Sequence, residues 1–164
     1  MKNFISKIGV FVVLAVLAFG CGNHQKDDKK DIQVDQLALI TEKIAKDPNN
    51  AALYHSRAKL YLEKKEINQA LGDINKAIQL NDKKPEFYIT LSDIFFAMVE
   101  LSKSKDALLK AVSLDNQNIE AYLKLAELNL YLKQYDETFK YTDKAAEIDK
   151  LNPKAYFIKG FALK

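Results

Sequence analysis

The chain has 164 residues, and its 25 Lys and Arg against 22 Asp and Glu give a formal charge of only +3. Because the basic residues form no stripe, the sequence offers no electrostatic drive towards nucleic acid. One Cys excludes an internal disulfide, and two His without a ligand spacing argue against a metal site.

Residues 1–20 have the composition of a signal peptide. Lys2 and Lys7 precede an apolar run over 8–19, which ends at Gly20. This run is too short to cross a bilayer core of about 30 Å as a permanent helix. We therefore expect a cleaved export signal.

Cys21 closes the sequence Leu-Ala-Phe-Gly-Cys over 17–21, which resembles a bacterial lipobox. The resemblance implies that Cys21 is lipidated and becomes the mature N-terminus. Two or three acyl chains would anchor the protein stably without a spanning helix. We expect a lipid-anchored protein of the bacterial cell envelope, at the outer membrane, on its periplasmic or its surface face. An ordinary cleaved signal and a buried Cys in an N-terminal helix are the alternatives.

Residues 21–31 lack large apolar side chains and are expected to form a flexible tether. The run over 25–28, Gln-Lys-Asp-Asp, resembles the short export signal of surface lipoproteins in some Gram-negative bacteria; a solvated charged linker is the alternative. A leading segment follows over 32–50, with a helix predicted at 32–46 from the spacing of Leu37, Ile40 and Ile44.

From residue 51 the sequence repeats with a period of 34. Tyrosines stand at each period, at Tyr54, Tyr88, Tyr122 and Tyr156. A fixed period of this length indicates a solenoid of repeated supersecondary units. We expect these tyrosines to be structural, so that replacing one with Ala costs about 3–5 kcal/mol, as large-to-small changes in a core do.

Small residues keep the same period. They allow two antiparallel helices to approach within about 8–10 Å, while larger side chains fill the layers between neighbouring repeats. The small positions are Ala58, Ser92, Ala126 and Gly160; Ala70, Ser104 and Thr138; and Ala77, Ala111 and Ala145.

This pattern resembles the tetratricopeptide repeat, a helix–turn–helix unit of 34 residues. The resemblance implies an all-α fold, an α-solenoid of antiparallel helix pairs with about three and a half repeats in a superhelix. The units are expected at 51–84, 85–118, 119–152 and, in part, 153–164. The predicted helices are 51–64, 67–80, 85–98, 101–114, 119–132, 135–148 and 154–163.

Four features depart from the family pattern. The periodic aromatic is Tyr instead of Trp, Arg57 and Lys159 replace an expected Leu, and Asn129 replaces an aromatic. The last unit also stops after its first helix, which leaves Tyr156 and Gly160 without the second helix on which they would pack. We interpret the sequence as an N-terminal fragment of a longer protein; a binding edge is the alternative.

The family binds peptides in a groove lined by the first helix of each pair. Carried over by position, the resemblance implies groove residues His55, Lys59, Glu86, Ile89, Asp93, Phe96, Leu123, Glu127, Leu130 and Tyr131. Members that bind chaperones carry a clamp of basic and amide side chains for a carboxylate, and this sequence lacks it. Instead, acidic residues flank an apolar strip made of Ile89, Phe96, Leu123, Leu130 and Tyr131.

The strip favours an apolar or amphipathic peptide as the partner. Packing of these residues against one another or against the leading helix is the alternative. No nucleophile setting, glycine-rich loop or ligand cluster points to catalysis, so neither an enzyme nor a cofactor is expected. The sequence thus predicts a membrane-anchored adaptor for proteins. The alternatives are a surface lipoprotein that binds a nutrient ligand, and a repeat region that supports an effector domain.

Overall fold

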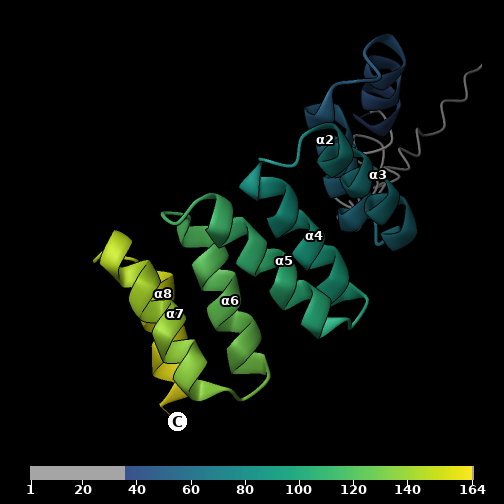
Figure 1. The fold of residues 1–164 in the computed structure, drawn as a ribbon. Coiled ribbons are helices and arrows are strands. Elements are labelled where there is room, and N and C mark those ends of the chain that lie inside the picture. Colours follow the sequence, from purple (N-terminus) through teal and green to yellow (C-terminus); the bar gives the residue numbers. More distant parts are fainter. Residues whose placement is uncertain (1–35, 164) are drawn as a thin grey trace, which may run out of the picture.

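The computed structural model describes residues 36–163, and helices are the only regular elements within that part of the chain. The predictions for the signal peptide, Cys21, the tether and residues 32–35 of the leading helix lie outside it. Residues 36–46 are helical, and seven helices follow side by side in chain order (Figure 1). They are α2 (Ala51–Glu63), α3 (Ile67–Leu80), α4 (Pro85–Ala97), α5 (Leu101–Leu114), α6 (Ile119–Tyr131), α7 (Tyr135–Ile148) and α8 (Pro153–Ala162).

The helices form consecutive pairs. Each of α2, α4 and α6 packs mainly on the helix that follows it, and the second helix of a pair packs on the first helix of the next pair. First helices also contact one another, as α2 contacts α4 and α6 contacts α8. The predicted solenoid of antiparallel helix pairs is thereby confirmed, and the helix ends fall within one residue of the prediction.

Small side chains lie where the two helices of a pair approach each other. Ala58, Ala70 and Ala126 are completely buried, and Ser92 and Ser104 lie with their hydroxyl oxygens 2.8 Å apart. The buried serines therefore satisfy each other, which a close contact between helices requires of polar groups. Larger residues, such as Ile74 and Leu108, fill the space between pairs as the sequence predicts.

The turn inside each pair has the same backbone form. Lys65, Val99 and Lys133 adopt positive φ values of 61°, 62° and 57°. In the first pair, Lys65 N–H donates to Leu62 and Glu66 N–H donates to Tyr61, which closes the helix end in a Schellman motif. Glycine usually occupies this left-handed position. Because Lys and Val occupy it here, no glycine in the sequence indicates these turns.

The periodic tyrosines connect one repeat to the next. The hydroxyls of Tyr54, Tyr88 and Tyr156 donate to the carbonyls of Pro48, Asp82 and Lys150, each six residues earlier in the preceding turn. Tyr122 instead stacks on Tyr141. The first three tyrosines are half-buried and Tyr156 is 57% exposed. Their ring edges and hydroxyls reach the surface because they bond to the turn.

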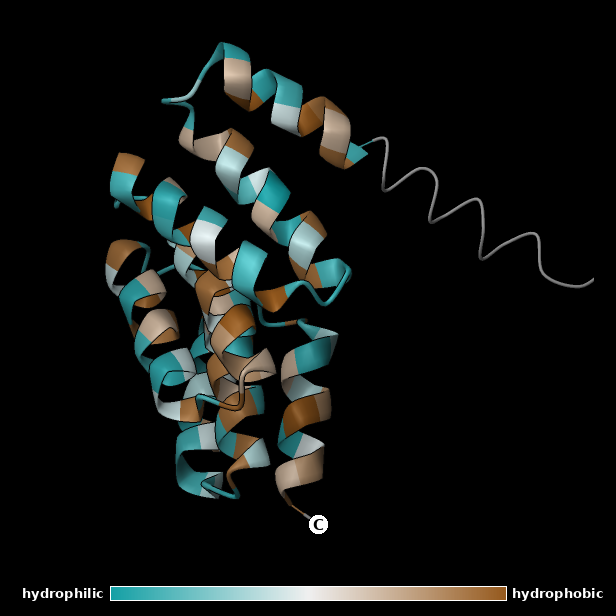
Figure 2. Ribbon diagram, turned by 90° about the vertical axis from the view of Figure 1, so that its right-hand side faces the viewer, coloured by the Kyte–Doolittle hydropathy of each residue, from teal (hydrophilic) through white to brown (hydrophobic). Residues whose placement is uncertain are grey.

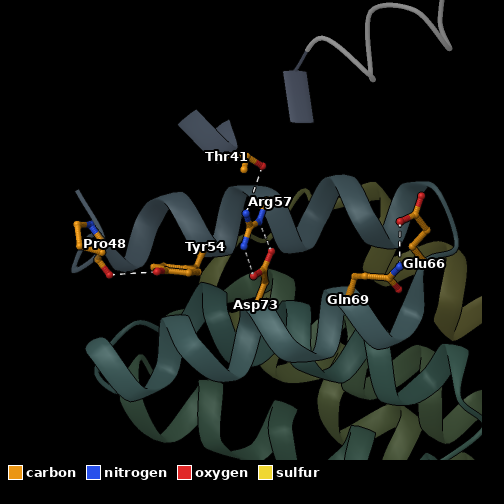
Figure 3. Close-up of polar contacts among 7 residues, drawn as sticks. All are labelled: Thr41, Pro48, Tyr54, Arg57, Glu66, Gln69 and Asp73. Atoms are coloured by element: carbon orange, nitrogen blue, oxygen red, sulfur yellow. Dashed lines mark hydrogen bonds and ion pairs between the residues drawn. The ribbon is translucent and has the colours of Figure 1, made fainter. Parts of the chain in front are cut away.

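The residues that depart from the family pattern all have polar partners. Arg57 donates to both carboxylate oxygens of Asp73 on α3, at 2.6 and 2.8 Å, and to Thr41 of the leading helix (Figure 3). Asn129, completely buried, donates to the Leu125 carbonyl and accepts from Lys105. Lys159 on α8 donates to Asp143 on α7. These substitutions replace apolar contacts by specific polar contacts between neighbouring helices.

Candidate peptide-binding groove

The first helices of the pairs bring most of the predicted binding residues onto one face, which we call the groove face. A pocket of about 190 Å³ opens between α2, α4 and α6. Five of its nine lining residues belong to the predicted groove set, namely His55, Lys59, Glu86, Ile89 and Asp93. The pocket residues are His55, Lys59, Leu62, Glu63, Glu86, Ile89, Thr90, Asp93 and Glu120.

A second pocket of about 230 Å³ adjoins the first one and shares Asp93 with it. Phe96 and Glu127 line its rim, while the paired hydroxyls of Ser92 and Ser104 lie in its wall. The two pockets follow one another from α2 towards α6. The groove face is therefore hollowed over at least three of the first helices, which is the arrangement that an extended or helical peptide requires.

The predicted apolar strip divides into two sets. Ile89 and Leu123 are only 5% and 6% exposed and belong to the core, and Leu130 is partly buried against the same core cluster. Ile89 and Leu123 therefore pack inward, as the alternative to peptide binding predicts, and Leu130 does so in part. Phe96 and Tyr131 are 44% and 62% exposed, and their rings meet edge to face with centroids 5.6 Å apart. The exposed apolar contact area of the strip therefore comes mainly from this aromatic pair.

Two further aromatics occupy groove positions that are not among the predicted binding residues. Phe157 and Phe161 on α8 stand at the fifth and ninth positions of the last unit, equivalent to His55 and Lys59. Both are more than half exposed, and their ring centroids lie 4.9 Å apart. The 34-residue period could have predicted them, because it places the fifth and ninth positions of every unit on the same face of the first helix.

The groove face is predominantly acidic. Glu86 and Glu120 line the first pocket, and each also stands in the first turn of its helix. Asp93 on α4 bonds Lys124 on α6 at 2.7 Å, and Glu127 on α6 lies 3.0 Å from Lys154 on α8. These ion pairs join consecutive first helices along the groove. The excess of carboxylates favours a partner segment that carries positive charge.

His55 connects the first two repeats beneath the groove face. Its Nε2 lies 2.9 Å from the Thr90 hydroxyl on α4, and its ring contacts that of Phe87. Burial lowers the pKa of His55 below its ordinary value; Lys59 lowers it further, and Glu86 opposes the shift. The neutral imidazole is therefore the form that this site favours.

Between residues 36 and 163, no three His, Cys, Asp or Glu side chains are grouped so that they could hold a metal ion. No helix in this range combines the length and the apolarity needed to span a bilayer. Hydrophobic and hydrophilic residues share each helix (Figure 2), as expected for helices that have both buried and solvent-exposed faces.

The first repeat matches a known family, and the whole array has known structural relatives. Residues 51–84 match the family model described as Tetratricopeptide repeat. The chain superimposes on TTC0263, a thermophilic tetratricopeptide-repeat protein of Thermus thermophilus, with a TM-score of 0.73 at 20% identity, covering 85% of this chain and 77% of that one. It superimposes on MamA with a TM-score of 0.72 at 24% identity, covering 84% and 80%.

A third relative is a complex. The chain superimposes on the first repeat domain of Spaghetti (RPAP3), bound to the HSP90 peptide SRMEEVD, with a TM-score of 0.63 at 15% identity, covering 69% of this chain and 90% of that one. No curated protein matches the sequence significantly. The chain therefore has the all-α solenoid fold of tetratricopeptide-repeat proteins.

Proposed function

We propose that this chain is a lipid-anchored adaptor of the bacterial cell envelope, which binds an apolar or amphipathic peptide segment of a partner protein on its groove face. The observation that carries the proposal is the pair of adjoining pockets with the exposed aromatic rings of Phe96 and Tyr131 beside them. Burying such rings is favourable by about 25 cal/mol per Å² of apolar surface. Aromatic anchors next to pockets are typical of the central residues of an interface.

The partner segment is expected to be amphipathic and basic. Its apolar side would contact Phe96, Tyr131 and, further along the face, Phe157 and Phe161. Its basic residues would lie near Glu86 of the first pocket. An acidic peptide such as SRMEEVD, which is bound by the repeat domain of RPAP3, would meet like charge here.

The anchor part of the proposal rests on the sequence of the N-terminal segment. Cys21 follows a short apolar run in a lipobox-like context, and a lipid on it would hold the repeats close to a membrane. The lipid would supply the location and the rigid helix array would supply recognition. Replacing Cys21 with Ser is expected to abolish fatty-acid labelling and to move the protein from the membrane pellet to the soluble fraction. Continued labelling of the variant would contradict lipidation at this residue.

A cross-linked pull-down tests the binding function. The native protein is compared with a Phe96→Ser, Tyr131→Ser variant, whose two changes lie at exposed side chains and so preserve the helical fold. The matched control is Leu109→Ser on α5, which is 37% exposed and lines neither pocket. Circular dichroism confirms that all three proteins are folded.

We expect a protein partner that the native protein and the control capture and that the groove variant loses. Equal capture by all three proteins would place binding outside the groove face. If no protein were captured by any of them, the adaptor function would be contradicted and a small-molecule ligand would become the better hypothesis.

A further inference from the structure

The first pocket of the groove face lies in the middle of the helix array. Its walls come only from α2, α4 and α6, and each of these helices packs on the second helix that follows it. Its volume of about 190 Å³ is below the range of about 300–1,000 Å³ that is typical of pockets for small molecules. The pocket therefore suits one side chain of a bound peptide better than a free ligand.

The lining of this pocket combines apolar walls with an excess of negative charge. Leu62 on α2 and Ile89 on α4 supply apolar surface. The pocket has one ammonium group, that of Lys59, and four carboxylates, those of Glu63, Glu86, Asp93 and Glu120. Because burial lowers the pKa of His55, its imidazole adds no second cation at neutral pH. The lining therefore favours a cationic side chain over an anionic one.

Two of these carboxylates can bind a cation without losing an internal partner. Asp93 is already bonded to Lys124, at 2.7 Å. Among the described residues 36–163, Glu86 and Glu120 form no ion pair, and both side chains are exposed. A cationic side chain in the pocket would pair with them and break no existing contact. Because these carboxylates are exposed, the attraction would weaken as salt is added.

The exposed aromatic pair of Phe96 and Tyr131 lies further along α4. Phe96 lines the second pocket, which shares Asp93 with the first. Ile89 of the first pocket stands two helical turns before Phe96, which corresponds to about 10 Å at about 1.5 Å per residue. An extended chain covers this distance in about three residues, and a helix covers it in about seven.

Given the peptide binding proposed above, on which this inference rests, we propose that the first pocket holds one lysine or arginine side chain of the partner segment. An apolar side chain of the same segment, about 10 Å away, contacts Phe96 and Tyr131. The aliphatic part of the basic residue lies along Leu62 and Ile89, and its charged end reaches Glu86. The groove face thus recognises a basic residue and an apolar residue at a fixed spacing.

The segment that follows Cys21 in this chain fits the two subsites poorly. Residues 21–31 carry three Lys and three Asp, so their charges cancel, and they include no large apolar side chain. Such a segment offers neither the net positive charge nor the apolar contact that the groove face favours. We therefore assign the basic residue to a partner protein.

Selection of random peptides tests the two subsites. A phage library of peptides of about twelve residues is selected on the full chain, on the charge variant Glu86→Gln, Glu120→Gln, and on the control Asp106→Asn, Asp136→Asn. The control removes the same charge from exposed carboxylates of α5 and α7 that line neither pocket. Circular dichroism confirms that all three proteins are folded.

Peptides selected on the native protein should carry Lys or Arg about three or about seven positions from a large apolar residue. The first spacing would show an extended segment, and the second a helical one. By fluorescence anisotropy, the charge variant should bind the best of these peptides about tenfold more weakly, and the control should bind it as the native protein does. Raising the salt concentration should reduce the difference between the charge variant and the native protein.

The outcomes separate a failure of this inference from a failure of peptide binding. Selected peptides without a basic residue, or an unchanged preference on the charge variant, would overturn the inference and leave peptide binding standing. If the native protein selects no peptides that the Phe96→Ser, Tyr131→Ser variant fails to bind, peptide binding on the groove face is itself contradicted.

A further variant tests whether lysines of the chain itself fill the first pocket. It carries Lys26→Ser, Lys29→Ser and Lys30→Ser, and we expect it to select the same peptides as the native protein. A preference for basic peptides that appears only in this variant would overturn the assignment to a partner protein.

Discussion

Arg57 and Asp73 form a bidentate ion pair that connects the two helices of the first repeat. Both side chains are largely buried, at 17% and 10% exposure, and the Arg57 guanidinium also lies 5.8 Å from the ring centroids of Tyr54 and Tyr61. The hydrogen bond to Asp73 raises the pKa of Arg57 above its ordinary value. This repeat therefore uses a paired charge at a position where the family pattern has an apolar residue.

Removing one partner of this pair should destabilise the protein strongly. Arg57→Leu leaves the Asp73 carboxylate buried without its cation, and we expect a loss of about 3 kcal/mol in the free energy of unfolding. The double variant Arg57→Leu, Asp73→Leu should return to within about 1 kcal/mol of the native value, because two apolar side chains can replace a buried pair. Urea unfolding followed by circular dichroism measures both. A double variant that is less stable than the single one would contradict this account.

The turn between α4 and α5 should be improved by glycine. Val99 is β-branched, 72% exposed and held at a φ of 62°, where an L-residue is strained. Val99→Gly removes this strain and loses little buried surface, so the protein should gain about 0.5–1 kcal/mol, or about 2–4 °C in Tm. Val99→Ala is the control and should gain less, since it retains a Cβ. Loss of stability in the glycine variant would show that the left-handed turn is not formed.

Stability should depend on the protonation of His55. Its pKa is lowered in the folded state, so the unfolded chain binds a proton more readily than the folded chain does. The contribution of the neutral form is fully present above the unfolded pKa of about 6.5 and is lost as the pH falls below that value. We expect the urea midpoint of the native protein to fall between about pH 7.5 and 5 by more than that of His55→Gln. Parallel midpoints for the two proteins would rule out the coupling.

The periodic tyrosines should differ in their contribution to stability. Tyr88 is half-buried and bonded to the Asp82 carbonyl, so Tyr88→Ala should cost about 2–3 kcal/mol through lost packing and a lost hydrogen bond. Tyr156 makes the equivalent bond to Lys150 but is mostly exposed, so Tyr156→Ala should cost about 1 kcal/mol in the single chain. Thermal unfolding in dilute solution measures which of the two variants loses more stability. Equal losses would mean that the face of α8 is covered in solution.

The period allowed the fold to be predicted closely, because each helix end repeats with the turn chemistry that follows it. Whether an individual groove position is buried or exposed was less predictable. Ile89 and Leu123 share their repeat position with His55, yet they are buried in the core. Their orientation depends on contacts between first helices of neighbouring repeats, and those contacts are made by residues about 34 positions apart. Such packing does not follow from the period alone.

The side-chain hydrogen bonds between helices could not be predicted from the sequence either. Asp73 gave no sign that it would bond Arg57, and Lys105 gave none that it would bond Asn129. Each pair joins helices whose rotation about their axes must be known to within a fraction of a turn. The three left-handed turn residues were missed for another reason, since Lys and Val do not signal positive φ as glycine does.

A photo-cross-linking amino acid placed at Tyr131 tests the central claim most directly. Tyr131 is exposed on the groove face beside Phe96, and the control position is Leu109 on α5, outside both pockets. After illumination of living cells, the account predicts an adduct with a partner protein from position 131 and none of that adduct from position 109. An adduct from position 109 alone, or none from either position, would contradict peptide binding on the groove face.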